Sequence, residues 1–188
     1  TKSDMHALRP CKDNVNSARG NKPFNEVIDE QTATWYWQDS QTSTIPSDNI
    51  EEYSENHGSF FEPREDRKGD VARTIFYFYT MYLDVADLDF FEEQKDALHV
   101  WHDEDPANEE EITRTWQIAN YQENKPNPFI LDSTLVERAY FYDGLLQGDI
   151  NGDGELNILD IVTLMNIILI GEFDLLGDLN SDGSLNIL

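Results

Sequence analysis

Apolar residues recur at helical spacing through residues 70–142 of the chain. They predict four helices, over residues 70–84, 88–101, 106–123 and 133–142. The first is the clearest, because its apolar stripe is wide enough to be buried on most sides, and Asp70 is its expected cap. In the third, Asp105 is the expected cap and Pro106 occupies the first turn, where its missing N–H costs nothing.

The pattern is weaker at the start of the chain. Residues 3–10 alternate loosely and predict an edge strand. Residues 15–19 predict a short helix that is capped by Asp13 or Asn14 and ended by Gly20.

Residues 21–66 are aromatic and polar and show no regular period. We predict irregular structure that wraps a core, with the Trp-Tyr-Trp run at 35–37 buried along one edge. The sequence therefore predicts a mainly α fold with a small β portion.

The composition changes near residue 144, where two glycines lie close together at 144 and 148. An apolar run over 158–170 follows, and it predicts a helix that is too short to cross a bilayer. We predict two domains, residues 1–143 and residues 144–188, and no membrane span.

The loop that precedes this run, residues 149–160, has the spacing of a calcium loop. Such a loop places oxygen ligands at positions 1, 3, 5, 7, 9 and 12 and a glycine at position 6. The predicted Ca²⁺ ligands are Asp149, Asn151, Asp153, the carbonyl of Glu155, Asn157 and Asp160. Gly154 permits the sharp turn at position 6.

The same pattern returns at residue 178. Its predicted ligands are Asp178, Asn180, Asp182 and the carbonyl of Ser184, and position 12 lies beyond residue 188. We therefore expect the second repeat to be truncated.

This loop-and-helix repeat over residues 147–188 resembles a type I dockerin. The resemblance implies a calcium-loaded module with a cohesin partner on a scaffold or cell surface, in an extracellular setting. Dockerins usually carry hydroxyl residues at loop positions 10 and 11, but this chain has Ile158 and Leu159. We infer an apolar contact or a buried helix face there.

Charge gives a conflicting signal about partners. The formal net charge is −25, and the last fifty positions hold nine acidic residues and no Lys or Arg. Such acidity repels phosphate and argues against a nucleic-acid partner. Residues 1–22 are the exception, because they carry an excess of three positive charges.

Three stretches of the first 140 residues carry distinctive motifs. The first reads Ser-Asp-Met-His-Ala-Leu-Arg-Pro from residue 3 and Val-Asn-Ser-Ala-Arg-Gly-Asn from residue 15. The second reads Phe-Glu-Pro-Arg-Glu-Asp-Arg-Lys-Gly-Asp-Val-Ala-Arg from residue 61, and the third joins Trp101, Asp105, Arg114, Gln122 and Asn-Pro-Phe-Ile from residue 127. Together they resemble the bacterial endonuclease I family of nonspecific nucleases.

The resemblance implies a ββα-metal domain, lacking its N-terminal part, in a secreted enzyme that hydrolyses DNA and RNA to 5′-phosphate products. Asn16 would bind Mg²⁺, because an amide oxygen suits a hard cation. Arg19 is the candidate catalytic residue that would hold a phosphate oxygen, with a surface pair to Asp13 as the alternative. Asn21 and Lys22 would contact the nucleic-acid backbone unless they serve the turn.

The family's general base belongs to a Glu-His pair, and no such pair occurs in residues 1–188. We therefore expect this stretch to be inactive alone. His6 is interpreted as structural rather than catalytic. The competing hypothesis is a non-catalytic, calcium-dependent protein-interaction module.

Arg73 lies on a helix that is otherwise apolar, where an unpaired charge would be costly. It predicts a carboxylate partner from the acidic run at 103–111, or a place in the active-site groove.

Overall fold

The computed structural model of the chain describes residues 3–141, 146–179 and 183–185. They form two compact units, residues 1–137 (unit 1) and residues 138–188 (unit 2). Helix accounts for 49% of the structure, and the sheet is a small antiparallel one of four strands. The predicted fold class is therefore confirmed. Within the described ranges, no helix combines the length and apolar character needed to span a bilayer.

Unit 1 does not begin with the predicted edge strand. Met5–Ala7 form a 3-10 turn instead, and the Asp4 carboxylate accepts a hydrogen bond from the His6 N–H at 2.9 Å. This side-chain bond to the backbone favours a turn over an extended chain. The short helix α1 (Asp13–Arg19) follows and ends at Gly20, whose φ of 56° is in the left-handed region. Lys12 is its N-terminal flanking residue, so Asp13 and Asn14 are not the cap.

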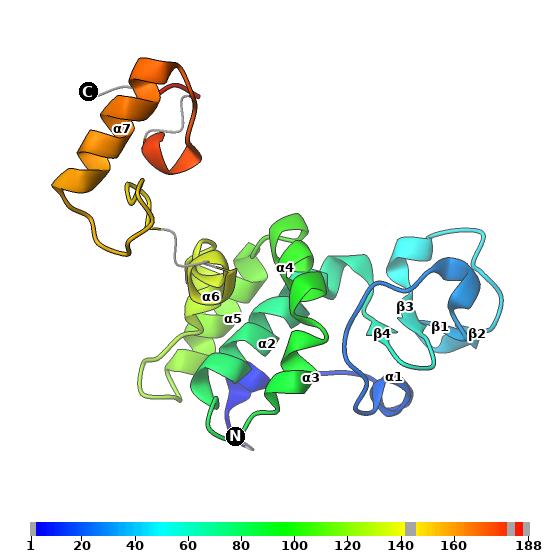
Figure 1. Cartoon of the computed structure of the whole chain (residues 1–188). Helices are drawn as coiled ribbons and strands as arrows, with labels where there is room; N and C mark the ends of the chain where they lie inside the picture. The colour runs from blue at the N-terminus through cyan, green and yellow to red at the C-terminus, as the bar shows by residue number, and fades with distance from the viewer. Residues whose placement is uncertain (1–2, 142–145, 180–182, 186–188) are drawn as a thin grey trace. The chain divides into compact units, whose positions relative to one another are not determined.

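Residues 21–66 contain a sheet, which corrects the prediction of irregular structure. The strands are β1 (Thr34–Trp37), β2 (Ser40–Thr42), β3 (Ser54–Asn56) and β4 (Phe61–Glu62), in the order β2-β1-β3-β4. Of the Trp-Tyr-Trp run that was predicted to be buried, Trp35 is fully buried on the interior strand β1, while Tyr36 and Trp37 are only partly buried. The register partner of Trp35 is Glu55, which in turn lies opposite Glu62. Figure 1 shows the sheet with α1 at one end of unit 1.

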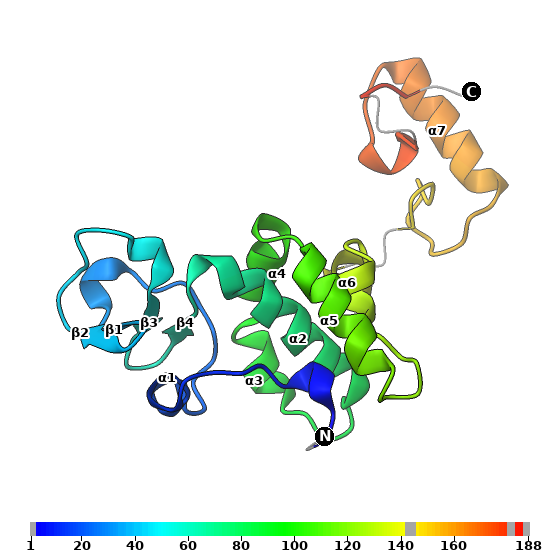
Figure 2. The same ribbon diagram turned by 180° about the vertical axis from the view of Figure 1, so that it is seen from behind.

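The helices of unit 1 are α2 (Lys68–Met81), α3 (Leu88–Glu92), α4 (Lys95–Glu104), α5 (Glu109–Ala119) and α6 (Pro128–Leu131). Figures 1 and 2 show them gathered at the other end of the unit, with α2 among its neighbours. The buried face of α2 carries Phe76 and Tyr79, whose rings lie 5.9 and 4.3 Å from that of Phe91. The prediction that this helix is buried on most sides is confirmed.

Three helix boundaries differ from the predictions. Asp70 is the third residue of α2 rather than its cap, because the helix begins at Lys68. The helix predicted over 88–101 is broken at Gln94, whose buried amide accepts the Phe24 N–H at 3.2 Å. Asn108, not Asp105, caps α5, and its side chain accepts the first free N–H groups of that helix.

Arg73 has the carboxylate partner that the sequence predicted. Its Nε donates to Glu111 at 2.9 Å, and its Nη1 donates to the Asp105 carbonyl at 2.7 Å. Arg73 and Glu111 are both buried, so each charge compensates the other.

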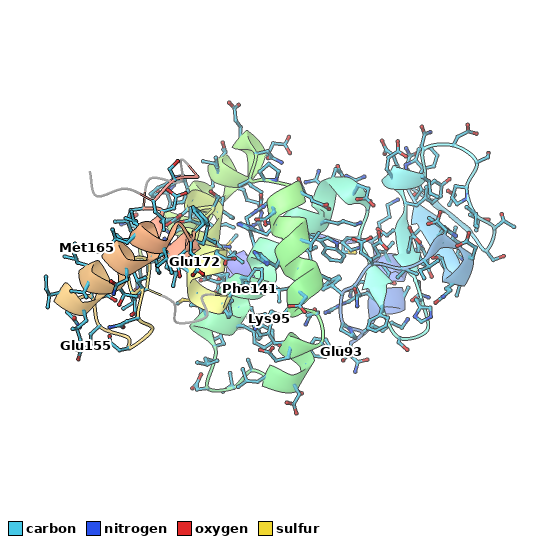
Figure 3. The ribbon with its side chains drawn as sticks, turned by 45° about the horizontal axis from the view of Figure 1, so that its top comes forward. Glu93, Lys95, Phe141, Glu155, Met165 and Glu172 are labelled. Atoms are coloured by element: carbon cyan, nitrogen blue, oxygen red, sulfur yellow. The ribbon has the colours of Figure 1, made fainter. Side chains whose placement is uncertain are left out.

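Unit 2 is built around α7 (Ile158–Ile170), which has the predicted bounds. Asn157 and Asp160 form a capping box at its start. Figure 3 labels Glu155 in the loop before the helix and Met165 on the helix. The helix predicted over 133–142 is only a π-helical turn at Glu137–Phe141 within the described residues, which exclude Tyr142.

The two loop repeats of unit 2 contact each other. The Gly148 N–H donates to the Leu176 carbonyl at 2.8 Å. A Cβ at Gly177 would lie 2.8 Å from a methyl carbon of Leu164 and 2.9 Å from one of Leu185, so the leucine side chains pack closely against this glycine.

Candidate nucleic-acid site

A pocket of about 760 Å³ lies in unit 1, between the segment before α1, α1 itself and the start of α2. Its polar and charged lining residues are Arg9, Cys11, Asn16, Arg19, Ser54, Arg64, Arg67, Asp70, Thr74 and Arg114. Five arginines and one aspartate leave this lining with a formal charge of +4. The chain as a whole carries −25, so the pocket reverses the sign of its surroundings.

Asn16 and Arg19 both line this pocket from α1, as their spacing predicted. The Asn16 side chain is exposed and makes no hydrogen bond with the described residues. Its amide oxygen is therefore available to a ligand.

Arg19 is held in place without a carboxylate. Its guanidinium lies 4.6 Å from the centre of the Phe24 ring, and its buried Nε has no hydrogen-bond partner. Burial lowers the pKa of Arg19 from its ordinary value, because the charged form loses solvation. The alternative pairing with Asp13 is not found among the described ion pairs.

Asn21 and Lys22 do not line the pocket. Lys22 Nζ donates to the Ala18 carbonyl at 2.9 Å and to Asn56 Oδ1 at 2.5 Å. It thus ties the end of α1 to β3, which is the turn role that the sequence left open.

Three of the pocket arginines are held by carboxylates. Arg9 Nη2 donates to Glu111 Oε1 at 2.7 Å, and its Nη1 lies 3.3 Å from Asp70. Arg67 Nη1 donates to Asp70 at 3.0 Å, while Arg64 pairs with Asp66 at 2.7 Å.

Arg114 differs from these three. Its Nη2 donates to the Met5 carbonyl at 3.2 Å and to the Leu8 carbonyl at 2.7 Å, and it has no ion pair among the described residues. Sequence reasoning placed Arg114 in a family motif but gave it no role.

His6 is structural, as interpreted from the sequence. Its Nε2 donates to the Lys125 carbonyl at 2.9 Å, and burial lowers its pKa below the ordinary value. The neighbouring Asp4 accepts the hydroxyls of Tyr77 and Tyr82 at 2.9 and 2.6 Å. This network fixes the turn that leads to the pocket.

Cys11 is the chain's single cysteine, and it lies exposed in the pocket wall. Partial burial of its sulfur raises the pKa of the thiol.

Asn16 is the lining amide that could bind a metal ion. The lining carboxylate, Asp70, is engaged by Arg9 and Arg67. Among the described residues, no three His, Cys, Asp or Glu side chains come together as a metal cluster. A single amide ligand still fits Mg²⁺, because this ion usually keeps several waters.

The two predicted calcium loops share one geometry where they are described. Asp149 is buried and accepts the Gly154 N–H at 2.8 Å, and Asp178 accepts the Gly183 N–H at 2.9 Å. Both glycines have positive φ, 82° and 78°. The calcium site itself stays a prediction.

The other predicted ligands of the first loop form hydrogen bonds within the loop. In the first loop, the oxygens of Asn151, Asp153, Asn157 and Asp160 accept backbone N–H groups of the loop and of the start of α7. Glu155 supplies a carbonyl that accepts the Asn157 side chain at 3.4 Å. In the second loop, Ser184 is exposed, while Asn180 and Asp182 lie outside the described residues.

Comparisons with known proteins come from curated sequences and from a family profile. The chain is 30% identical over 141 residues to an extracellular ribonuclease of Bacillus subtilis (strain 168), and 32% identical over 142 residues to an extracellular ribonuclease of Bacillus amyloliquefaciens. Each match covers 68% of this chain but 43% of the relative, so the chain spans less than half of their length. No solved structure matches the chain significantly. The profile described as Endonuclease I matches residues 1–134, and the chain therefore belongs to the Endonuclease I family.

Proposed function

We propose that this chain contributes the substrate pocket of a secreted, metal-dependent endonuclease that hydrolyses DNA and RNA to 5′-phosphate products. The family is generally metal-dependent, and the two relatives are named extracellular ribonucleases. The observation that carries the proposal is the pocket of charge +4, in which Asn16 and Arg19 have no carboxylate partners.

Each of the two residues has a separate role. Asn16 would hold the metal ion through its amide oxygen, and the metal would stabilise the charge that develops at the scissile phosphate. Arg19 lines the pocket and would contact a phosphate oxygen through its guanidinium, an interaction that is strong because both groups are charged. Lys22 is bonded to protein groups, so phosphate contact is proposed for Arg19 in preference to Lys22.

The test uses the full-length protein with Mg²⁺, because residues 1–188 contain no Glu-His pair. Asn16→Ala is expected to lower hydrolysis of plasmid and of RNA by about 100-fold or more, since even the loss of an outer-shell partner costs 10–100-fold. Asn14→Ala is the matched control, because Asn14 lies on the same helix but does not line the pocket. Full activity of Asn16→Ala would refute the metal assignment.

We further propose that unit 2 is a calcium-dependent docking module of the dockerin type. The support is that in both loops a glycine with positive φ donates its N–H to the Asp carboxylate at the start of the loop. Ile158 and Leu159 are 66% and 55% exposed, which favours an apolar contact with a cohesin-like partner over a buried helix face. The test is a calcium titration of the chain followed by calorimetry.

These experiments also distinguish the nuclease from the competing function, a protein-interaction module without catalysis. It is favoured if the full-length protein binds calcium through unit 2 but hydrolyses neither DNA nor RNA.

A further inference from the structure

The strongest unassigned feature of the pocket is the pair of guanidinium groups at Arg9 and Arg114. Arg9 reaches Glu111 at 2.7 Å, and Glu111 lies three residues before Arg114 on α5. Residues three apart on a helix share a face, so the two guanidinium groups are neighbours. Both line the pocket.

The charges around this pair do not balance. Asp70 and Glu111 are the carboxylates that hold Arg9, and the same two carboxylates also contact Arg67 and Arg73. Among the described residues, the hydrogen bonds of the Arg114 guanidinium go to the carbonyl oxygens of Met5 and Leu8, not to a carboxylate. Its charge is therefore left without a direct counterion in the described part of the chain.

The surroundings penalise this uncompensated charge. Burial lowers the pKa of Arg114 and the positive charge of Arg9 lowers it further, and the nearby charges of Asp70 and Glu111 offset these effects only in part. An anion bound beside Arg114 would remove both penalties, because it would replace lost solvation and offset the repulsion between the two arginines.

The geometry leaves Arg114 free to bind such an anion. Both of its hydrogen bonds come from Nη2, so Nε and Nη1 have no partner among the described residues. A guanidinium presents its N–H groups in a planar fork that matches the oxygens of a phosphate.

We infer that Arg114, beside Arg9, binds a backbone phosphate of the nucleic acid next to the phosphate held at Asn16 and Arg19. The inference rests on the proposed function and deepens it. Arg19 comes from α1 and Arg114 from α5, so the two arginines reach the pocket from different walls. A substrate that contacts both spans at least two phosphates and is therefore a polynucleotide.

The test measures binding without catalysis, using the chain of residues 1–188 and a fluorescent single-stranded DNA of twelve nucleotides, with no added divalent metal. Fluorescence anisotropy gives the Kd over a series of NaCl concentrations. Arg114→Gln is expected to weaken binding several-fold and to reduce the slope of log K against log salt by about 0.7, the value for one phosphate contact on a single strand.

Two further variants separate charge from structure. Arg114→Lys keeps the charge and should retain the salt slope, while Lys125→Gln removes an exposed lysine that pairs with Glu123 outside the pocket and should change little. Because Arg114→Gln also removes the hydrogen bonds to the Met5 and Leu8 carbonyls, the melting temperature of each variant is measured, and the comparison with Arg114→Lys separates loss of charge from loss of structure.

The inference is overturned if Arg114→Gln binds with the wild-type Kd and slope, or if Arg114→Lys loses as much of the slope as Arg114→Gln. It is also overturned if the wild-type chain does not bind the oligonucleotide. Hydrolysis by the full-length protein and its loss in Asn16→Ala remain separate readouts, so the proposed function can survive the failure of this subsite.

Discussion

At the scale of single residues, the fold places several ionisable groups where water cannot reach them. Glu55 and Glu62 lie opposite each other in adjacent strands and are 7% and 4% exposed. Lys68 compensates Glu62 at 2.8 Å but also contacts Glu26 and Glu65. One lysine therefore pairs with three carboxylates, whereas among the described residues the Glu55 carboxylate accepts a hydrogen bond from the Thr32 hydroxyl and has no ion pair.

This arrangement makes the stability of unit 1 depend on pH. Burial raises the pKa of Glu55 to about 7, and the facing Glu62 contributes in the same direction. The folded state therefore favours the protonated form of Glu55. The resulting contribution to the free energy of unfolding is complete below the ordinary pKa of 4.5 and is lost as the pH rises through about 7.

We predict that Glu55→Gln reduces the loss of stability that unit 1 undergoes as the pH rises. The variant should exceed the wild type in stability at pH 8 by on the order of 1–3 kcal/mol, and the difference should shrink towards pH 5. Urea unfolding across this pH range is the measurement. Glu51→Gln, at an exposed position, controls for the general effect of removing one negative charge. Parallel pH profiles for Glu55→Gln and the wild type would contradict the prediction.

At the scale of elements, the start of α2 is pinned against the end of α4. The Gly69 N–H donates to Asp105 Oδ2 at 2.9 Å, and Arg73 donates to the Asp105 carbonyl at 2.7 Å. A Cβ at Gly69 would lie 1.9 Å from that carbonyl oxygen. The two helices can approach this closely only because residue 69 has no side chain.

Gly69→Ala is therefore expected to destabilise unit 1 by about 1–3 kcal/mol, the usual cost of overpacking, because the backbone must shift. Gly58→Ala is the matched control: nothing lies within 4 Å of its added Cβ, and its φ is not positive. That variant should stay within about 0.5 kcal/mol of the wild type. Equal urea midpoints for the two variants would show that α2 and α4 adjust freely.

The elements differ in how well the sequence predicted them. Ile158–Ile170 matched its predicted helix because the apolar run and its cap lie in one local window. The sheet was missed because Ser40–Thr42 and Ser54–Asn56 are short and polar, and their pairing depends on residues far away in the chain. Asp70 resembles a cap in sequence, but it lies inside α2, and its carboxylate pairs with Arg9 and Arg67.

At the scale of the whole molecule, the net charge of the chain is opposite in sign to the charge of the pocket lining. A chain with a net charge of −25 argues against a nucleic-acid partner, yet five of its thirteen basic residues line one pocket. The motif around Asn16 and Arg19 was visible because it is contiguous. Arg9, Arg64, Arg67 and Arg114 lie in three separate motif stretches and converge only after folding, so the sequence did not indicate that they share a pocket.

The division into two units carries a prediction about calcium. If the loops of unit 2 bind Ca²⁺, a concentration of about 100 times the Kd should stabilise that unit by about 2.7 kcal/mol and leave unit 1 unchanged. Calorimetry with calcium and with a chelator measures this difference. Asp153→Asn, at an exposed position of the first loop, should reduce the calcium-dependent shift. A melting profile that is the same with calcium and with the chelator would refute the calcium assignment.

The position of Cys11 offers an experimental handle. Because it is the chain's single thiol and stands exposed in the pocket wall, a maleimide dye would attach at this one place without any mutagenesis. A small dye there should change its emission when an oligonucleotide enters, whereas a bulky adduct should block entry. The pocket thus contains its own labelling site, which allows occupancy to be followed in real time.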